Sequence, residues 1–371
     1  MDKREKLIIL FAVLGMAFYF LIATPQIMDD GTHYQGFTES LARGKLDFKT
    51  FYGFHGLSII SVPIFWITGS HMAIIITSEI LYLLSLPLAF IIGRKFYVTN
   101  KAGVLFMVLI LLMPYTYTTM MRGFQEAALL FFVLFTIHGA LNKKIWTPLA
   151  WAYGGITKPF NLVLFPLFIK DFLNRKKIIW VSIALAIGVI YLGASYYQTG
   201  HLVNNAAIGS YDGNFDTGNP PPLVESFAPG LKGFLRAGAN LLLHSRKILV
   251  SPLIIILGCL SLLLNKDLKL RKELILAIGL NFILVGSLTF SFSKYLLPMA
   301  VLLALCSVPY LLKYRWLVFL VIIDSIFVFI PIWNYFGFHF WSNIFIYLIP
   351  LYLSAIIYLY GVKSDINHSR S

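Results

Sequence analysis

Long apolar runs, separated by short polar stretches, follow one another along almost the whole chain. The runs lie near residues 7–24, 71–93, 102–120, 124–141, 145–157, 160–172, 178–197, 247–265, 273–290, 295–312, 316–332 and 340–361. A helix needs about 20 apolar residues to cross a bilayer. The bilayer core contains no water to hydrogen-bond with backbone groups, so an apolar segment that crosses it must form a helix. The pattern therefore predicts an all-α polytopic membrane protein with about twelve transmembrane helices.

The composition indicates a single membrane-embedded domain over residues 1–371. Of the 371 residues, 58% are hydrophobic and the mean hydropathy is +0.79, whereas soluble globular chains are about 45–50% apolar. The net charge of +14 would suit nucleic acid, but the basic residues stand in short groups between apolar runs, which is typical of membrane topology. We therefore expect no nucleic-acid partner. Cys259 and Cys306 lie inside apolar runs and indicate neither a disulfide framework nor a metal site.

The loops suggest which side of the membrane each segment faces. The first run is longer than the apolar core of a signal peptide, about 7–15 residues, so we expect a retained first helix. With the N-terminus in the cytoplasm, about twenty basic residues fall in inner loops and about ten in outer loops, as the positive-inside rule requires. Both chain ends are then cytoplasmic. Two outer segments, 25–70 and 198–247, are large enough to hold a site.

Some apolar runs are too short to cross the bilayer upright. The segment 57–68 contains Pro63, and we interpret it as a re-entrant or interfacial piece on the outer face. The runs at 145–157 and 160–172 are also short, so each is expected to be broken or tilted.

An acidic pair, Asp29 and Asp30, stands where the chain leaves the first apolar run. Two adjacent carboxylates repel each other, so a site that keeps both needs a reason. One interpretation is structural: Thr32–Gln35 fits a capping box, and acidic residues complement the positive end of a helix. An apolar stripe that begins at Tyr34 suits a helix lying at the membrane interface. The other interpretation is that the pair does chemistry.

Further charged residues come from later outer loops. Arg122 and Glu126 lie at the junction of two runs, Lys158 between the two short runs, and Arg246 and Lys294 at the starts of later spans. Each alone fits simple anchoring at the lipid headgroups. Together with the acidic pair they come from five loops of one face. Cations beside carboxylates at a lipid boundary suit a substrate with a phosphate and a long apolar tail.

The histidines of the outer face give a weaker metal pattern. His33 and His55 could join Asp29 or Glu126 around a metal ion, but no HxxxH or HExxH spacing supports such a site. Whether the protein binds a metal at these residues is therefore left unknown.

Two acidic residues, Glu79 and Asp324, fall inside predicted spans, where ionisable side chains are costly and often functional. Both fall in the outer half of their spans. They could pack against polar neighbours such as Thr77 and Ser325, or they could line the same cavity as the outer-loop residues. Their role is left open.

The order of these motifs resembles the GT-C superfamily of integral membrane glycosyltransferases, which includes protein O-mannosyltransferases, the aminoarabinose transferase that acts on lipid A, and GPI mannosyltransferases. In that pattern a first helix is followed by an acidic pair and a helix bearing a tyrosine, here 29–30 and Tyr34. Phe-His-Gly at 54–56 and the segment 57–69 resemble the family's HPP-like turn, without its prolines, and its interfacial helix. MRGFQE resembles an Arg-Gly and acidic element, GGITKP a Leu-Thr-Lys element, and SKYLLP an Arg-Tyr-Leu-Leu-Pro element with Lys294 in place of arginine.

The resemblance implies a GT-C-like bundle with interfacial helices in the first outer loop. It implies a transferase that moves sugar from a polyprenyl-phosphate donor to a hydroxyl of a lipid, glycan or protein acceptor, by single displacement with inversion. The active site would face outward from a bacterial or archaeal plasma membrane, among membrane lipids. Members of the superfamily differ in metal dependence, so Mg²⁺ or Mn²⁺ stays open and no other cofactor is expected.

The resemblance and the residue chemistry together assign roles. Asp30 is the predicted base that takes the proton of the acceptor hydroxyl, and Asp29 beside it makes one member of the pair a better base. The predicted phosphate-binding residues, which offset charge on the leaving group, are Arg122, Lys158, Lys294 and Arg246. The predicted supporting residues are Glu126, Tyr34, His55 and Tyr295.

Two other functions remain possible from the sequence. A transporter or flippase of lipid-linked sugars would use charged residues near the midplane, for which Glu79 and Asp324 are the only candidates. A glycan ligase or polymerase would share much of this architecture and use a diphosphate-linked donor. The identity of the donor separates this last class from a monophosphate-dependent transferase.

Overall fold

The computed structural model describes residues 2–23, 25–27, 30–51, 53–173, 175–202, 251–286, 293–335 and 348–363. These residues form only helices and connections, with no strand among them. The α-helices are α1 Lys3–Ile22, α2 Asp30–Ala42, α3 Gly56–Thr68, α4 Ala73–Tyr97, α5 Asn100–Leu111, α6 Pro114–Met120, α7 Glu126–Leu141, α8 Thr147–Thr157, α9 Arg175–Thr199, α13 Pro252–Leu264, α14 Arg271–Gly286, α15 Leu297–Lys313, α16 Trp316–Tyr335 and α18 Ile349–Lys363. Two 3₁₀ helices, η1 Pro159–Leu173 and η3 Ser293–Leu296, connect them. The all-α fold class is thus confirmed.

Among the described residues, α1, α4 and residues 178–199 of α9 are long and apolar enough to cross a membrane. Eight shorter helices are also apolar. Large apolar side chains face outward from these spans, with Leu21 82% exposed on α1 and Ile190 71% exposed on α9. An apolar exterior of this kind suits contact with lipid tails, and the chain is an integral membrane protein. The expected number of spans, about twelve, stays a prediction.

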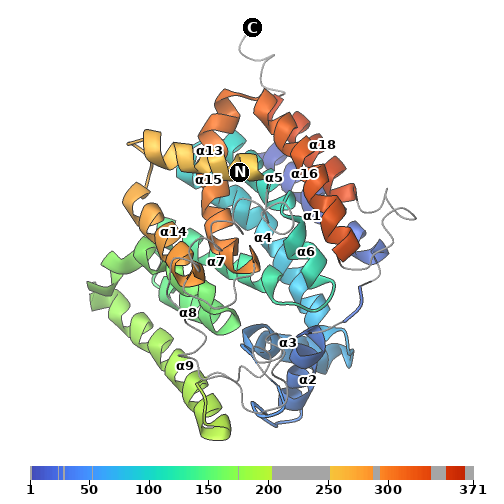
Figure 1. The fold of residues 1–371 in the computed structure, drawn as a ribbon, viewed down its shortest axis with the longest axis vertical. Helices are drawn as coiled ribbons and strands as arrows, with labels where there is room; N and C mark the ends of the chain where they lie inside the picture. The colour runs from blue at the N-terminus through green and yellow to red at the C-terminus, as the bar shows by residue number, and fades with distance from the viewer. Residues whose placement is uncertain are drawn as a thin grey trace.

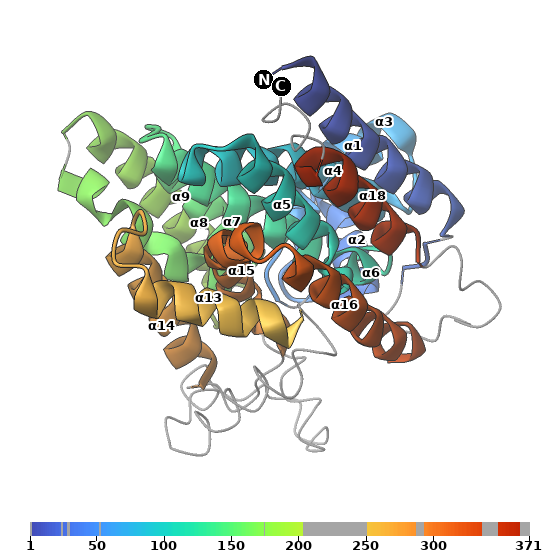
Figure 2. The same ribbon diagram turned by 90° about the horizontal axis from the view of Figure 1, so that it is seen from above.

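The centre of the bundle is a tightly packed helical hairpin. A Cβ atom at Gly93 of α4 would lie 2.6 Å from the Ala102 carbonyl oxygen, and one at Gly103 of α5 would lie 2.7 Å from the Phe90 carbonyl oxygen. Only glycine lets the two backbones come this close, as is common between membrane helices. Helix α5 is buried from Ala102 to its end and lies between α4, α15 and α18 (Figure 2).

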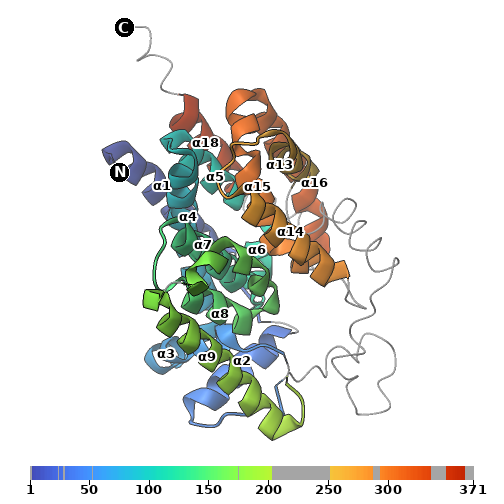
Figure 3. The same cartoon turned by 90° about the vertical axis from the view of Figure 1, so that its left-hand side faces the viewer.

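Helices α2 and α3 lie together at one end of the molecule, beside the C-terminal end of α9 (Figures 1 and 3). This agrees with the expected pair of helices in the segment 25–70. The predicted capping box at Thr32–Gln35 is wrong, because α2 already includes Asp30 and Thr32 stands inside it. The Gln35 side chain is used elsewhere: its Oε1 accepts from the backbone N–H of Ile74 at 3.1 Å.

Two apolar runs are broken in ways that bear on the site. The expected break between the runs at 145–157 and 160–172 is confirmed, because Lys158 is extended (φ −150°, ψ 132°) between α8 and η1. The run at 102–120, expected to be one segment, is divided into α5 and α6 just before Pro114. Proline has no N–H and disfavours helix in the preceding residue, which accounts for the break.

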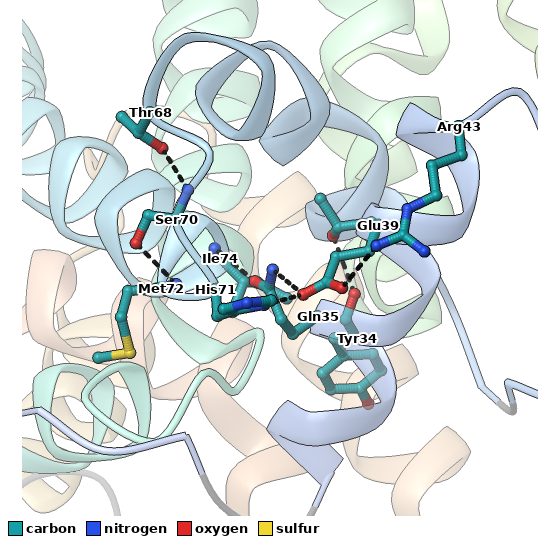
Figure 4. A network of polar contacts seen from close by, with 10 residues as sticks. Tyr34, Gln35, Glu39, Arg43, Thr68, Ser70, His71, Met72 and Ile74 are labelled. Atoms are coloured by element: carbon teal, nitrogen blue, oxygen red, sulfur yellow. Dashed lines mark hydrogen bonds and ion pairs between the residues drawn. The ribbon is translucent and has the colours of Figure 1, made fainter.

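A polar network holds α2 against the start of α4 (Figure 4). Glu39 Oε1 lies 2.7 Å from His71 Nδ1 and accepts from Gln35 Nε2 at 3.0 Å, and Arg43 lies 3.8 Å from the other oxygen. Partial burial pushes the pKa of the Glu39 carboxyl upward. The hydrogen bonds from His71 and Gln35 and the nearby His71 and Arg43 charges outweigh it, so the pKa lies below its ordinary value of 4.5.

This lowered pKa predicts a pH-dependent stability difference between the wild type and Glu39→Gln. A carboxyl with a depressed folded-state pKa stabilises the fold fully above its ordinary value of 4.5 and loses that contribution as pH falls through the folded-state value. We expect the variant to unfold at a lower temperature than the wild type at pH 5–7. The loss in free energy of unfolding should be less than about 1 kcal/mol, because the network is near the surface. The difference should vanish below the folded-state pKa. A difference that persists unchanged to strongly acidic pH would contradict the assignment. Detergent-solubilised protein, heated in a pH series, provides the measurement.

Candidate functional site

The start of α2 lies directly against the connection between α6 and α7. A Cβ atom at Gly31 would lie 2.0 Å from the Arg122 carbonyl oxygen and 3.2 Å from the Gly123 Cα, so backbone touches backbone. Gly123 itself has φ +82°, a left-handed conformation suited to glycine. The backbone N–H of Gln26 also donates to the Met121 carbonyl at 2.9 Å. These contacts bring the half-buried Asp30 beside the Arg122 segment, as the sequence predicted for two motifs of one site.

The contact at Gly31 predicts that Gly31→Ala destabilises the protein. The new Cβ has no flexible side chain to displace, because its neighbour is a backbone carbonyl. We expect a loss of about 1–3 kcal/mol, as for other overpacked positions, seen as a lower unfolding temperature in detergent. Gly188→Ala in α9 is the matched control, since nothing lies within 4 Å of its Cβ position. The control should be neutral or slightly stabilising, and equal losses in both variants would contradict the packing argument.

A buried ion pair joins the two later motifs. Lys158 Nζ at the end of α8 donates to Glu126 Oε1 at the start of α7. The Glu126 side chain is fully buried and that of Lys158 is 11% exposed. A charge at this depth requires a partner, because transfer out of water costs several kcal/mol. The two residues stand 32 positions apart in the sequence, so the contact depends on how α7 and α8 pack.

The start of α3 is fixed to both of these elements. The Gln125 side-chain N–H donates to the Phe54 carbonyl, which lies just before α3. A Cβ at Gly56 would lie 2.3 Å from Thr157 Oγ1 and 2.6 Å from the Thr157 backbone nitrogen. The first residue of α3 therefore packs on the last residue of α8, next to Lys158. Three segments far apart in the sequence meet here, on the face that also carries Asp30.

His55, a predicted supporting residue, lies in an aromatic box next to this junction. Its ring stacks on Phe37 with centroids 3.9 Å apart, and Phe48 meets it edge-on at 5.4 Å. The Tyr191 hydroxyl lies 3.0 Å from His55 Nδ1 and 3.1 Å from the His55 backbone nitrogen. His55 is fully buried. Its contacts thus tie the loop before α3 to α2 and α9.

Tyr34 and Tyr295 have different surroundings. Tyr34 is buried on α2 against Leu57 and Ile74, and its carbonyl accepts from Ser58 Oγ at 2.9 Å. The Tyr295 ring stacks on Phe160 with centroids 4.4 Å apart. Phe160 is two residues beyond Lys158, so this contact brings the SKYLLP motif close to the GGITKP motif.

Three predicted site residues cannot be placed in this arrangement. Asp29 and Arg246 lie outside the described residues, as does the side chain of Lys294. Most of the large outer segment 198–247 is outside them too. Within the described part of the chain, no group of three or more His, Cys, Asp or Glu side chains could hold a metal ion. His33 and His55 belong to separate ring contacts, and metal dependence stays open.

Asp324 has a structural partner. Its Oδ2 accepts from the hydroxyl of Ser251 at 2.5 Å, and Ser251 Oγ in turn accepts from the Leu253 backbone N–H at 3.3 Å as the N-cap of α13. The Ser325 hydroxyl instead donates to the carbonyl of Val321 within its own helix. Asp324 therefore secures a helix start. Like Ser325, the Thr77 hydroxyl near Glu79 donates within its own helix, to the Ala73 carbonyl.

Several residues that shape the site were not predicted. The importance of Gly31 and Gly123 cannot be recognised from the sequence, because it depends on the contact between two backbone segments far apart in the chain. Tyr191 lies in an apolar run, 136 residues beyond its partner His55, and no local pattern marks it. Gln125 stands inside the quoted motif MRGFQE and could have been singled out as a buried polar residue.

The fold defines the class: the protein has a GT-C-like fold, as its likeness to solved structures shows. The chain is similar to ArnT from Cupriavidus metallidurans, a GT-C aminoarabinose transferase, in a crystal structure bound to undecaprenyl phosphate. The identity is 11%, the TM-score is 0.57, and the match covers 96% of this chain and 77% of that one. The apo structure of the same ArnT matches with a TM-score of 0.55 at 10% identity, over 97% of this chain and 78% of that one. No known family model matches the sequence, and no curated protein matches it either.

Proposed function

We propose that the protein is a glycosyltransferase that moves a sugar from a polyprenyl-phosphate donor to an acceptor hydroxyl on the extracytoplasmic face of a membrane. The observation that supports the proposal is the backbone contact of Gly31 with Arg122 and Gly123, because it brings the segment that carries Asp30 against the segment that carries Arg122. The GT-C-like fold supports it, and so does the bound undecaprenyl phosphate of the ArnT structure. A cell-envelope glycan is the class of product that such a donor would serve.

The reaction proposed is a single displacement with inversion. The acceptor oxygen attacks the anomeric carbon of the sugar while the bond from that carbon to the phosphate oxygen breaks. The electron pair of that bond leaves on the polyprenyl phosphate, and the hydroxyl proton goes to the Asp30 carboxylate. Asp30 is half-buried at the first turn of α2, so an acceptor can still reach it. A positioned base of this kind contributes about 10²–10⁴-fold to the rate.

The cations of the site would hold and neutralise the leaving phosphate. Arg122 is 8% exposed, and its guanidinium can bind phosphate oxygens in a fork. Lys158 is held at its place by Glu126, which fixes its ammonium before a donor arrives. Lys294 and Arg246 remain proposed as further donor-binding residues, and Glu126, Tyr34, His55 and Tyr295 as supporting ones. Asp29 remains proposed as the second member of the acidic pair.

The structure bears differently on the two alternative functions, a flippase and a ligase or polymerase. A flippase reading depended on Glu79 and Asp324, and the bond from Ser251 gives Asp324 a structural role. A ligase or polymerase that uses a diphosphate-linked donor keeps the same fold and site. The acceptor class, the metal requirement and the outward orientation in a plasma membrane remain part of the proposal.

A donor-cleavage assay tests the proposed function. Purified full-length protein is incubated with a panel of undecaprenyl-monophosphate sugars and, separately, with diphosphate-linked oligosaccharides, in the presence of membrane-lipid and glycan acceptors. Release of undecaprenyl phosphate, followed by mass spectrometry, is the expected result with a monophosphate donor. Exclusive use of diphosphate donors would instead favour a ligase. Movement of intact donor across a proteoliposome bilayer without cleavage would overturn the transferase proposal.

The phosphate-binding role of Arg122 has its own test. Arg122→Lys keeps the charge but loses the fork, so we expect a clear rise in the KM for the donor. Arg43→Lys is the control, because Arg43 is an exposed arginine just after α2 that pairs with Glu39. An unchanged donor KM in Arg122→Lys would contradict the assignment.

A further inference from the structure

A second cationic site lies at the far end of α4. This helix begins at Ala73, next to α3, and its 25 residues extend over about 37 Å to Tyr97. The last turn of α4 lies at the end of the bundle opposite α2 and α3 (Figure 3). A cavity of about 640 Å³ is lined by residues of this turn. Its lining residues are Ile91, Arg94, Lys95, Val98, Asn100 and Lys269. The cavity therefore joins the α4–α5 turn to the α13–α14 turn.

The charges around this cavity are strongly unbalanced. Arg94, Lys95 and Lys269 bring three positive charges into its lining. The single ion pair that the described residues form with these three is Arg94 with Glu5, at 3.2 Å. Lys95 and Lys269 are exposed and form no ion pair with the described part of the chain. Like charges gathered around one hollow lower the energy of an anion bound there.

The surface that leads to the cavity is apolar. Ile80, Leu84 and Ile91 are exposed along α4, at spacings that keep them on the helix face that ends at Lys95. On the other side, Leu263 and Leu264 at the end of α13 are 67% and 66% exposed. These side chains face the space that lipid tails fill around a membrane protein. A ligand bound here would therefore combine an anionic head with apolar chains.

The two turns around the cavity are also conformationally unusual. Val98 has φ 57° and Leu270, next to Lys269, has φ 55°, both in the left-handed region. Such a conformation is a true outlier for a β-branched residue such as Val98, and backbone strain of this kind is often found where a ligand is held. In addition, the Thr99 side chain makes no capping bond at the start of α5, which leaves backbone N–H groups turned toward this end.

We propose that this cavity binds the headgroup of an anionic phospholipid. Arg94, Lys95 and Lys269 bind its phosphate, and the acyl chains lie along the apolar faces of α4 and α13. The bound lipid would tie the α4–α5 turn to the α13–α14 turn. The proposal does not depend on sugar transfer, because the cavity and Asp30 lie at opposite ends of the bundle.

Native mass spectrometry of the full-length protein tests this proposal. The protein in detergent is titrated with phosphatidylglycerol and, separately, with phosphatidylcholine. We compare Lys95→Gln/Lys269→Gln with the control Lys266→Gln/Lys313→Gln, which removes two exposed lysines from turns and helix ends outside the cavity lining. Each basic residue near a lipid surface contributes about 1 kcal/mol, so the cavity variant should bind phosphatidylglycerol roughly 30-fold more weakly. The control should bind it as the wild type does.

Three outcomes would overturn the proposal. Equal losses in the cavity variant and the control would show diffuse surface attraction. Unchanged binding in the cavity variant would show that the phosphate is held elsewhere. Full displacement of phosphatidylglycerol by excess inorganic phosphate would show a site for a soluble anion. A thermal shift of the wild type by phosphatidylglycerol, absent in the cavity variant, gives a second readout if native spectra are crowded.

Discussion

Asp30→Asn is expected to abolish sugar transfer while the protein remains folded. The substitution keeps the size of the side chain and its place at the first turn of α2 but removes the group that accepts the proton. A general base contributes about 10²–10⁴-fold, so we expect a loss of about 100- to 10,000-fold in the rate of donor cleavage. The measurement is the release of undecaprenyl phosphate, alongside an unfolding temperature in detergent that stays close to the wild-type value.

Asp47→Asn is the matched control for Asp30→Asn. Asp47 lies in the same outer segment, but its carboxylate accepts from the Thr50 hydroxyl at 2.7 Å and from the Thr50 and Lys49 N–H groups. These hydrogen bonds, led by that of the Thr50 side chain, lower the pKa of Asp47 and mark it as a turn-forming residue. Its replacement should leave transfer within about twofold. Asp29→Asn completes the set, and a larger loss there than in Asp30→Asn would move the base to Asp29.

Breaking the Glu126–Lys158 pair is expected to have the largest effect on stability. Glu126→Gln or Lys158→Met alone leaves a buried charge without its partner, which typically costs about 3–5 kcal/mol. The double variant removes both charges, so it should be more stable than the sum of the two single losses predicts. Unfolding of the detergent-solubilised protein, measured for all four members of the cycle, gives the coupling energy.

An exposed pair elsewhere provides the control for this cycle. Lys170 lies 3.0 Å from Glu273, but its side chain is 84% exposed. Solvent screens such a pair, and Lys170→Met should change stability by less than about 1 kcal/mol. Strictly additive losses at Glu126 and Lys158 would show that the two side chains do not act as a pair. All Lys158 variants should also lose donor use, because the same ammonium is proposed to hold the phosphate.

Much of the fold follows from features that a linear pattern records well. Hydropathy predicts helices, and the short runs on either side of Lys158 predict the break that the structure has there. Hydropathy does not register the loss of one backbone N–H, so the division before Pro114 was missed. The predicted capping box failed for a similar reason. Its residue types suit a helix start, but the helix begins earlier, and tertiary contacts recruit Gln35 to the start of α4.

The sequence predicted that the site residues share one face of the membrane, but it did not predict which of them are in contact. Charge and spacing placed Asp30, Arg122 and Lys158 on one face, and the structure brings their segments together. The partner of Glu126 could not be predicted, because the neighbouring Arg122 is equally suitable by charge. The choice between them depends on how α7 and α8 pack, which is a property of shapes far apart in the sequence. The same holds for Tyr191 and His55.

The approach of Gly31 to Arg122 and Gly123 has a consequence for how such proteins can be detected and altered. The two chain segments touch through backbone atoms, and the contact requires only that position 31 has no Cβ atom. The side chains of Arg122 and its neighbours can then vary without loss of this backbone contact. An alignment of sequences would record only the two glycines, whereas a comparison of structures records the contact between the two segments.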